Sequence, residues 1–257
     1  ESNICYGEGG AGTFSDGKLN TGVNDPHSKF VLDEFFKHGA KPDILSDAMP
    51  HIGSDYLQQV VKRFREEILS LGGDILFQSA ITGLLLKGDH VEGVRYVDKD
   101  GNEKSLASRE VFLALGHSPK DTMVELENEG LRIEPKDFSI GVRLEHLQSE
   151  IDAANYHEAA LKKGLPPSSY KSVVHLSSGR AVYSFCMCPG GYVVNSSSEE
   201  NSVLTNGMSN NARDGKNGNA ALLVNVTVKV YFHGHLLDGF FYREDLERSG
   251  FCRGYCS

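Results

Sequence analysis

The sequence predicts an α/β protein of two domains, and two observations support this fold class. In residues 1–136, apolar residues at helical spacing are followed by short apolar strands, an alternating strand and a further apolar strand. From about Asp137 onward, short strand patterns follow one another with one helix among them. We therefore expect a first domain over 1–136, a mostly β second domain over 137–227 and a divergent tail over 228–257.

The composition is that of a soluble globular protein. Hydrophobic residues make up 39% of the 257 residues and charged residues 24%, which is enough to bury a core. The formal net charge of −9 disfavours nucleic acid as a partner, because phosphate binding requires clustered Lys and Arg. Since the sequence contains no apolar run of membrane-spanning length and no secretory signal, we expect no membrane partner and a cytoplasmic location.

The first domain is expected to begin with a long loop over residues 1–26, which are rich in Gly, Ser, Thr, Asp and Asn. Helical spacing predicts a helix over 30–38 that ends at Gly39. A longer helix is predicted from Asp55, its expected N-cap, to Gly72 and Gly73. Its apolar stripe consists of Leu57, Val60, Val61, Phe64, Ile68 and Leu71.

Strands are expected next over 74–77, 81–86 and 90–97, with turns at 87–89 and 100–102. A buried strand over 110–115 then ends at Gly116. In the second domain, strands are predicted over 138–144, 172–175, 181–185, 192–194, 202–205 and 220–226, with a helix over 145–155. The polar segment 196–219 is expected to be partly loop.

The glycine-rich opening is the most informative segment. Gly7, Gly9 and Gly12 satisfy G-x-G-x-x-G, but neither a preceding strand nor a following helix is expected there, so a dinucleotide fingerprint is rejected. The stretch from Gly12 to Lys18 has P-loop spacing but continues with Leu19 where Ser or Thr belongs, and it is rejected too.

A third interpretation is a non-helical loop that brings its backbone close to a flat or anionic ligand, with Thr13, Ser15 and Lys18 in polar contact. The alternative, which composition alone favours, is a flexible surface loop.

The amino-acid sequence of residues 7–19 resembles a segment of the predicted FAD-dependent dehydrogenases of bacteria and plastids. These proteins are two-domain flavoproteins of the glutathione-reductase type. Further blocks resemble the same family in the same order: 41–42, 50–55, 115–122, 140–146, 183–191 and 206–209. The resemblance implies a partial FAD/NAD(P)-binding domain of Rossmann-like type and a substrate-side β domain. It also implies FAD as cofactor, NAD(P)H as a further candidate co-substrate and a small-molecule substrate that it does not identify.

By the same resemblance, the opening loop lies along FAD, the strand at Ile81 touches adenine, and the turn at 116–118 covers the cofactor. The flavin-binding residues expected in this way are Glu8, Gly9, Gly10, Ala11, Gly12, Thr13, Ser15, Asp16, Gly17, Lys18, Ile81, Gly116, His117 and Ser118.

His117 is the candidate catalytic residue, because it titrates near neutrality. The alternative, which we favour, is that it only hydrogen-bonds the backbone or the following helix, since flavin supplies the redox chemistry. Arg143, Glu145 and His146 form either an active-site cluster or a polar strand end.

The chain has five cysteines, an odd number without framework spacing, which predicts reduced thiols. Cys186 and Cys188 share one strand face, so their thiols either form a redox pair or, as we favour, are structural. No second ligand pair accompanies them, and we predict no metal site.

Family members carry a strand, a true G-x-G-x-x-G turn and a helix before the segment that matches this chain, and a Gly-Asp element after it. We therefore expect an FAD-dependent oxidoreductase fragment that is inactive by itself. The alternative is a non-catalytic remnant or binding module that keeps the fold without FAD.

Overall fold

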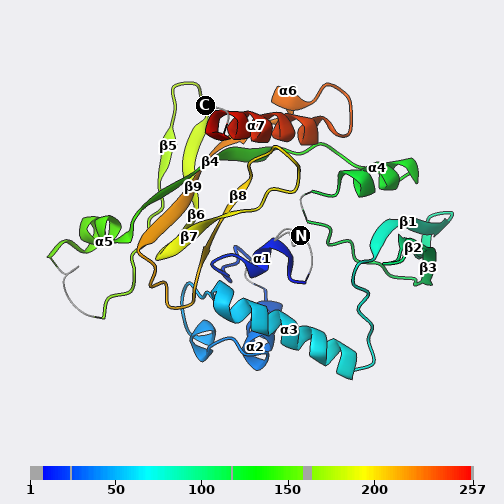
Figure 1. Cartoon of the computed structure of the whole chain (residues 1–257), viewed down its shortest axis with the longest axis horizontal. Coiled ribbons are helices and arrows are strands. Elements are labelled where there is room, and N and C mark those ends of the chain that lie inside the picture. Colours follow the sequence, from blue (N-terminus) through cyan, green and yellow to red (C-terminus); the bar gives the residue numbers. More distant parts are fainter. Residues whose placement is uncertain (1–7, 24, 117, 159–163, 256–257) are drawn as a thin grey trace.

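A computed structural model describes residues 8–23, 25–116, 118–158 and 164–255 (Figure 1). Within this part of the chain the strands form three sheets: β1-β2-β3, β4-β9-β6-β5 and β7-β8. All of the strand pairs are antiparallel. The structure is thus a mixture of helices and antiparallel sheets, and the Rossmann-like character of residues 1–136 stays a prediction.

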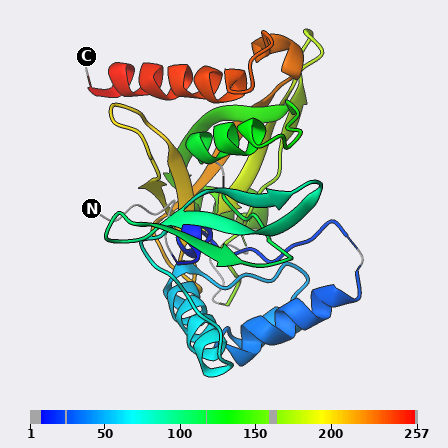
Figure 2. The ribbon, with the colours of Figure 1, turned by 90° about the vertical axis from the view of Figure 1, so that its right-hand side faces the viewer.

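The first helices pack around a small apolar core. The elements are α1 (Gly10–Thr13), α2 (His27–Lys37), the 3-10 helix η1 (Pro42–Leu45) and α3 (Ser54–Ser70), and α2 and α3 meet at the bottom of Figure 2. Two predicted helices are thereby confirmed, and they meet where the Phe35 ring packs edge-on against Phe64, with centroids 5.6 Å apart. The buried side chains of this core are Ala40, Ile44, Ile52, Leu57 and Val60.

The start of α3 differs from the prediction. Gly53 is its N-cap residue, with φ of 83°, and Asp55 lies in the first turn of the helix. The Asp55 carboxylate instead accepts the backbone N–H of Asn211 at 2.8 Å. The side chain expected to cap α3 therefore connects this helix to a loop of the second half of the chain.

A buried histidine joins α2 to α3. The His38 ring stacks on Phe64 with centroids 4.0 Å apart, its Nε2 pairs with the Glu67 carboxylate, and its Nδ1 lies 2.7 Å from the Glu34 carbonyl oxygen. Although Glu34, His38 and Glu67 are close enough together to hold a metal ion, the Lys37 ammonium lies 2.6 Å from Glu67 Oε1. We therefore interpret the group as an ion-pair cluster that fastens the two helices.

The strands predicted over 81–86 and 90–97 are confirmed as β1 (Ala80–Lys87) and β2 (His90–Val97). The turn predicted at 100–102 leads into a third strand, β3 (Glu103–Ala107), which completes a three-stranded meander. Helix α4 (Lys120–Asn128) is attached to it through Glu129, which follows the helix. The Glu129 carboxylate accepts the backbone N–H of Leu84 at 2.8 Å and pairs with the Arg95 guanidinium.

The strands predicted over 74–77 and 110–115 are wrong, because both segments lack strand structure. Leu76 is 53% exposed and Phe112 is 92% exposed. A buried apolar strand forms only where neighbouring strands satisfy its backbone and cover its faces. Within the described residues, neither segment has such a neighbour.

The strands of the second half largely agree with the predicted positions. The four-stranded sheet consists of β4 (Phe138–Leu147), β9 (Asn217–Val226), β6 (Ala181–Cys188) and β5 (Val173–His175), and α5 (Gln148–Tyr156) follows β4. A hairpin of β7 (Gly191–Asn195) and β8 (Thr205–Ser209) lies against this sheet (Figure 1). The strand predicted over 202–205 begins only at Thr205, so β8 lies within the segment that was expected to be partly loop.

Residues 228–255, expected as a divergent tail, form α6 (Val228–Tyr231) and α7 (Asp238–Tyr255). Helix α7 crosses the end of the four-stranded sheet in Figure 1 and is held by an ion pair between Glu244 and Lys120 of α4. The backbone N–H of Val203 also donates to the Glu247 carbonyl oxygen at 3.1 Å. No helix in the described part of the chain has the length and hydropathy to cross a membrane.

Replacing a core isoleucine tests this packing. Ile52 is 1% exposed, whereas Ile68 on α3 is 44% exposed. Ile52→Ala is expected to lower the free energy of unfolding by roughly 2–5 kcal/mol, because the cavity it leaves cannot close fully. The matched variant Ile68→Ala should cost no more than about 1 kcal/mol. Urea denaturation measures both, and equal losses would contradict the core described here.

Candidate functional site

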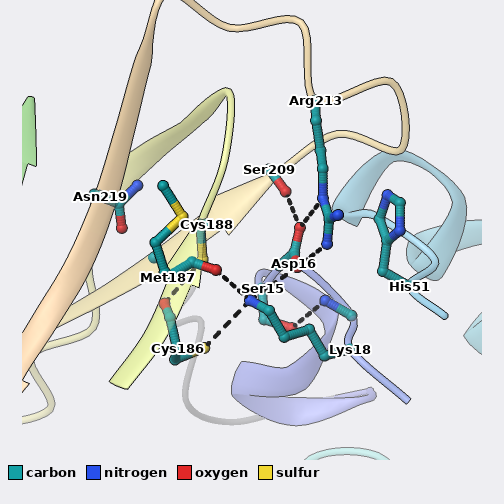
Figure 3. A network of polar contacts seen from close by, with 12 residues as sticks. Ser15, Asp16, Lys18, His51, Cys186, Met187, Cys188, Ser209, Arg213 and Asn219 are labelled. Atoms are coloured by element: carbon teal, nitrogen blue, oxygen red, sulfur yellow. Dashed lines mark hydrogen bonds and ion pairs between the residues drawn. The ribbon is translucent and has the colours of Figure 1, made fainter. Parts of the chain in front are cut away.

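The glycine-rich opening is packed against the rest of the protein. Contrary to the expectation of a non-helical loop, residues Gly10–Thr13 form the single helical turn α1, preceded by Gly9 with φ of 78°. The chain then runs antiparallel to residues 50–53, with backbone hydrogen bonds from Ile52 to Gly17 at 3.0 Å and from Gly53 to Asp16 at 3.1 Å. These bonds place Ser15, Asp16 and Lys18 between α3 and the second half of the chain (Figure 3).

Asp16 is the centre of this junction and is 0% exposed. The Arg213 guanidinium binds it with two nitrogens, at 3.0 Å from Oδ1 and 2.5 Å from Oδ2. The Lys18 ammonium lies 2.9 Å from Oδ2, and the Ser209 hydroxyl donates to Oδ1. Burial by itself would raise the pKa of Asp16, but the hydrogen bond from Arg213 and the positive charges of Lys18 and Arg213 lower it to about 2.

The other polar side chains of the opening also bind protein groups. Thr13 Oγ1 donates to the Glu8 carbonyl oxygen at 3.4 Å, and Ser15 Oγ donates to the Gly12 carbonyl oxygen at 2.7 Å. The Glu8 carboxylate pairs with Arg65 at 3.3 Å. The side chains of Glu8, Thr13 and Ser15, which were expected to contact a ligand, therefore stabilise the conformation of the segment. The part of the segment that remains available to a ligand is its backbone.

Gly12 and Gly116 are among the glycines that leave open space beside their backbone. A Cβ added at Gly12 would meet no atom of the described residues within 4 Å, and the same holds at Gly116, which has φ of 72°. A flat ligand could lie against such backbone, because no side chain intervenes. Gly17 differs, since a Cβ there would lie 2.8 Å from Leu57.

Lys18 reaches from the opening to the end of β6. Its ammonium donates to the Met187 carbonyl oxygen at 2.5 Å and lies 4.0 Å from Cys186 Sγ (Figure 3). The pairing of β6 with β9 shifts between Phe185 and Cys188, and Cys186 has φ of 47°. We call residues 186–188 the β6 bulge.

Arg143 of β4 and Asn219 of β9 complete the site beside the β6 bulge. Arg143 Nη1 donates to Asn219 Oδ1 at 2.7 Å and lies 3.5 Å from the Cys186 carbonyl oxygen. Asn219 is 0% exposed. Arg143 Nε and Asn219 Nδ2 are buried donors without a hydrogen-bond partner among the described residues.

The structure separates the charged triplet of β4. Of its members, Arg143 reaches the β6 bulge. The Glu145 carboxylate accepts the side-chain amide of Asn217 at 2.6 Å, and His146 Nε2 lies 3.0 Å from the Tyr170 hydroxyl. Glu145 and His146 thus have partners of their own.

Other predicted flavin contacts lie outside this junction. Ile81 is in the three-stranded sheet, where it pairs with Tyr96. Gly116 and Ser118 precede α4, and His117, the candidate catalytic residue, lies outside the described residues.

Arg213 and Ser209 were not predicted as partners of Asp16, and Asn219 was not predicted as a partner of Arg143. Ser209 lies in the block 206–209 that resembles the family, and this resemblance was the only feature of the sequence that pointed to it. Arg213 and Asn219 fall in a Gly- and Asn-rich segment where no spacing marks a site. Their roles depend on contacts to residues far away in the chain, which sequence patterns do not reveal.

A cleft of about 450 Å³ adjoins Arg143, between the four-stranded sheet, the β7–β8 hairpin and α7. Arg143 lies at one side, and Arg243 and Glu247 of α7 also line it. Its walls are mainly apolar and include Phe138, Ile140, Val193, Leu204, Leu223 and Leu246. Volume and lining are typical of a small-molecule site.

The second half of the chain is similar to flavin-dependent proteins. Residues 137–256 match the family described as "FAD-dependent protein, C-terminal domain-like", and the match includes α6 and α7. An uncharacterized protein of Clostridium beijerinckii is 40% identical over 255 residues, covering 99% of this chain and 47% of that protein. The chain thus spans about half the length of this relative, and the findings support an FAD-dependent family in general.

The buried carboxylate gives a prediction about acid stability. The pKa of Asp16 is lowered from 3.8 to about 2, so its contribution to folding is present above pH 4 and is lost as the pH falls towards 2. The loss should amount to about 2 kcal/mol of the free energy of unfolding. Asp16→Asn should lower the free energy of unfolding by roughly 3 kcal/mol at neutral pH, because Arg213 loses its charged partner. The same substitution should remove the part of the pH dependence that Asp16 causes.

Asp25→Asn is the matched control, because Asp25 has a 52% exposed side chain and bonds to neighbouring His27. It should change the free energy of unfolding at neutral pH by no more than about 0.5 kcal/mol. Urea denaturation from pH 7 to 2 measures all three proteins. If Asp16→Asn and Asp25→Asn behave alike, Asp16 does not hold the junction.

Proposed function

We propose that this chain is part of an FAD-dependent oxidoreductase that acts on a small molecule. The match of residues 137–256 to the FAD-dependent family carries this proposal. The glycine-rich opening supports it, because its backbone is fixed in place at the Asp16 junction with one side open at Gly12. A ligand that needs close backbone approach gains affinity when that backbone is already ordered.

We propose that the described residues hold a flavin through their backbone. Gly12 and Gly116 have open space beside them, whereas the side chains of Thr13, Ser15 and Asp16 bind protein groups. We propose that the segment 8–18 and the chain at Gly116 lie along the cofactor. FAD, when bound, accepts or donates the electron pair of the reaction, and this chain holds and orients it.

The cleft beside Arg143 is the proposed substrate site. Its apolar walls suit a substrate with an apolar body, and Arg143 offers a positive charge to an anionic or carbonyl oxygen. NAD(P)H is proposed as a co-substrate by the family resemblance alone. The net charge of −9 favours such small molecules over nucleic acid as partners.

A pair of glycine substitutions tests the flavin position. A Cβ added at Gly12 or at Gly22 would meet no atom within 4 Å of the described structure. Gly12→Val should therefore fold normally but weaken FAD binding at least about tenfold, because its side chain occupies the space proposed for the flavin. Gly22→Val, also in the opening segment, should leave FAD binding unchanged.

FAD binding is measured by quenching of flavin fluorescence and by the increase in melting temperature that a ligand of the native state causes. Because the chain spans 47% of its relative, the titration is also made on a longer form that carries the relative's flanking segments. If the longer form folds but neither quenches FAD fluorescence nor melts higher with it, the flavoenzyme assignment fails. A non-catalytic binding module would then be the better description.

A further inference from the structure

The two cysteines of the β6 bulge are not used by the proposed flavin chemistry. The left-handed φ of Cys186 breaks the extended course of β6, so residues 186 and 188 do not have the spacing of a regular strand. The Cys188 thiol donates to the Cys186 carbonyl oxygen at 3.4 Å, and the two side chains are close enough for each to shift the pKa of the other. Two reduced thiols are thus held next to each other.

The charges around these thiols are mainly positive. From the opening segment, the Lys18 ammonium lies 4.0 Å from Cys186 Sγ, and from β4, Arg143 lies 3.5 Å from the Cys186 carbonyl oxygen. Asp16 is the acidic group nearby, and Arg213 and Lys18 balance its charge. Such an environment favours thiolate over thiol.

The two thiols differ in accessibility. Cys188 is 0% exposed, whereas Cys186 is half-buried and can be reached from solvent. Next to Cys188 in the sheet register is Asn219, which is also 0% exposed. The Arg143 guanidinium, which donates to Asn219 and lies 3.5 Å from the Cys186 carbonyl oxygen, keeps a positive charge next to the thiol pair.

We propose that Cys186 and Cys188 form a redox-active pair that reduces a hydroperoxide. The Cys186 thiolate attacks one peroxide oxygen, the O–O bond breaks, and the leaving alkoxide or hydroxide takes a proton to form an alcohol or water. This step makes Cys186 a sulfenic acid. The Cys188 thiol then attacks the sulfenic sulfur, which releases water and forms the Cys186–Cys188 disulfide. Two thiols lose two electrons, and the peroxide gains them.

The pKa values of the two thiols agree with these roles. The hydrogen bond from Cys188 and the charges of Lys18 and Arg143 outweigh burial and lower the pKa of Cys186 to about 6. The hydrogen bond with Cys186 and burial raise the pKa of Cys188. Cys186 is therefore the nucleophile at neutral pH, and Cys188 keeps its proton until it attacks the sulfenic acid.

Hydrogen peroxide is the probe, and the full chain carries Cys5→Ser, Cys252→Ser and Cys256→Ser so that the pair alone can react. One equivalent of peroxide should remove both free thiols and lower the intact mass by two hydrogens. Cys188→Ser should stop at a sulfenic acid that dimedone labels at Cys186. Cys186→Ser should lose at least about tenfold in oxidation rate, because no thiolate remains.

The pH dependence separates a nucleophile from a merely accessible thiol. Alkylation of Cys186 by iodoacetamide should reach half its maximal rate near pH 6. Lys18→Met should move this midpoint upward and Lys18→Arg should restore it, with circular dichroism and melting temperature confirming the fold. The matched control carries Cys252, which is exposed on α7, as its only cysteine, and the midpoints of the two proteins should differ.

The proposal is overturned if the pair alkylates with the same midpoint as Cys252, or if peroxide yields no intramolecular disulfide. It is also overturned if Cys188→Ser accumulates no sulfenic acid. These assays contain no flavin, so their failure would not affect the FAD proposal. Failure of the FAD titration would likewise not affect the proposal of a redox-active cysteine pair.

Discussion

The buried carboxylate of Asp16 is the interaction on which the rest of the site depends. A fully covered charge is costly unless it is paired and hydrogen-bonded, and here Arg213, Lys18 and Ser209 supply its partners. Asp16 lies near the start of the chain, while Arg213 and Ser209 lie about 200 residues later. One carboxylate thereby joins the opening segment to the second half of the protein.

This junction explains why the glycine-rich opening is ordered. A segment with so many glycines loses much conformational entropy when it folds, and that loss must be offset by specific contacts. The Asp16 ion pairs, the backbone bonds to residues 50–53 and the bond from Ser54 to Ser15 at 2.7 Å provide them. The backbone at Gly12 is thus presented in one conformation, as a flat cofactor would require.

Lys18 connects the two proposed chemistries. The same ammonium pairs with Asp16, donates to Met187 and lies beside Cys186. A change in the charge of Cys186 would therefore act on the residue that helps to neutralise Asp16. The opening segment, the cleft beside Arg143 and the thiol pair are neighbours in space although they come from both halves of the chain.

Local patterns in the sequence determined the elements whose stability is local. The apolar stripes of α2 and α3 and the hairpin turns of the β1–β3 meander predict these elements because each is set by periodicity and turn chemistry. The glycine-rich opening and the cysteines at 186 and 188 were also recognisable as unusual. The residues that surround them in the folded protein could not be recognised from the sequence.

The tertiary structure decided everything that depends on distant partners. Asp55 fits an N-cap by sequence but binds Asn211. Segments 74–77 and 110–115 have the apolar character of strands but pair with no strand among the described residues. Arg213 is an unremarkable residue in a polar segment until folding brings it to Asp16. Hydrogen bonds and ion pairs depend on distances in space, and spacing along the chain carries no information about contacts made nearly two hundred residues apart.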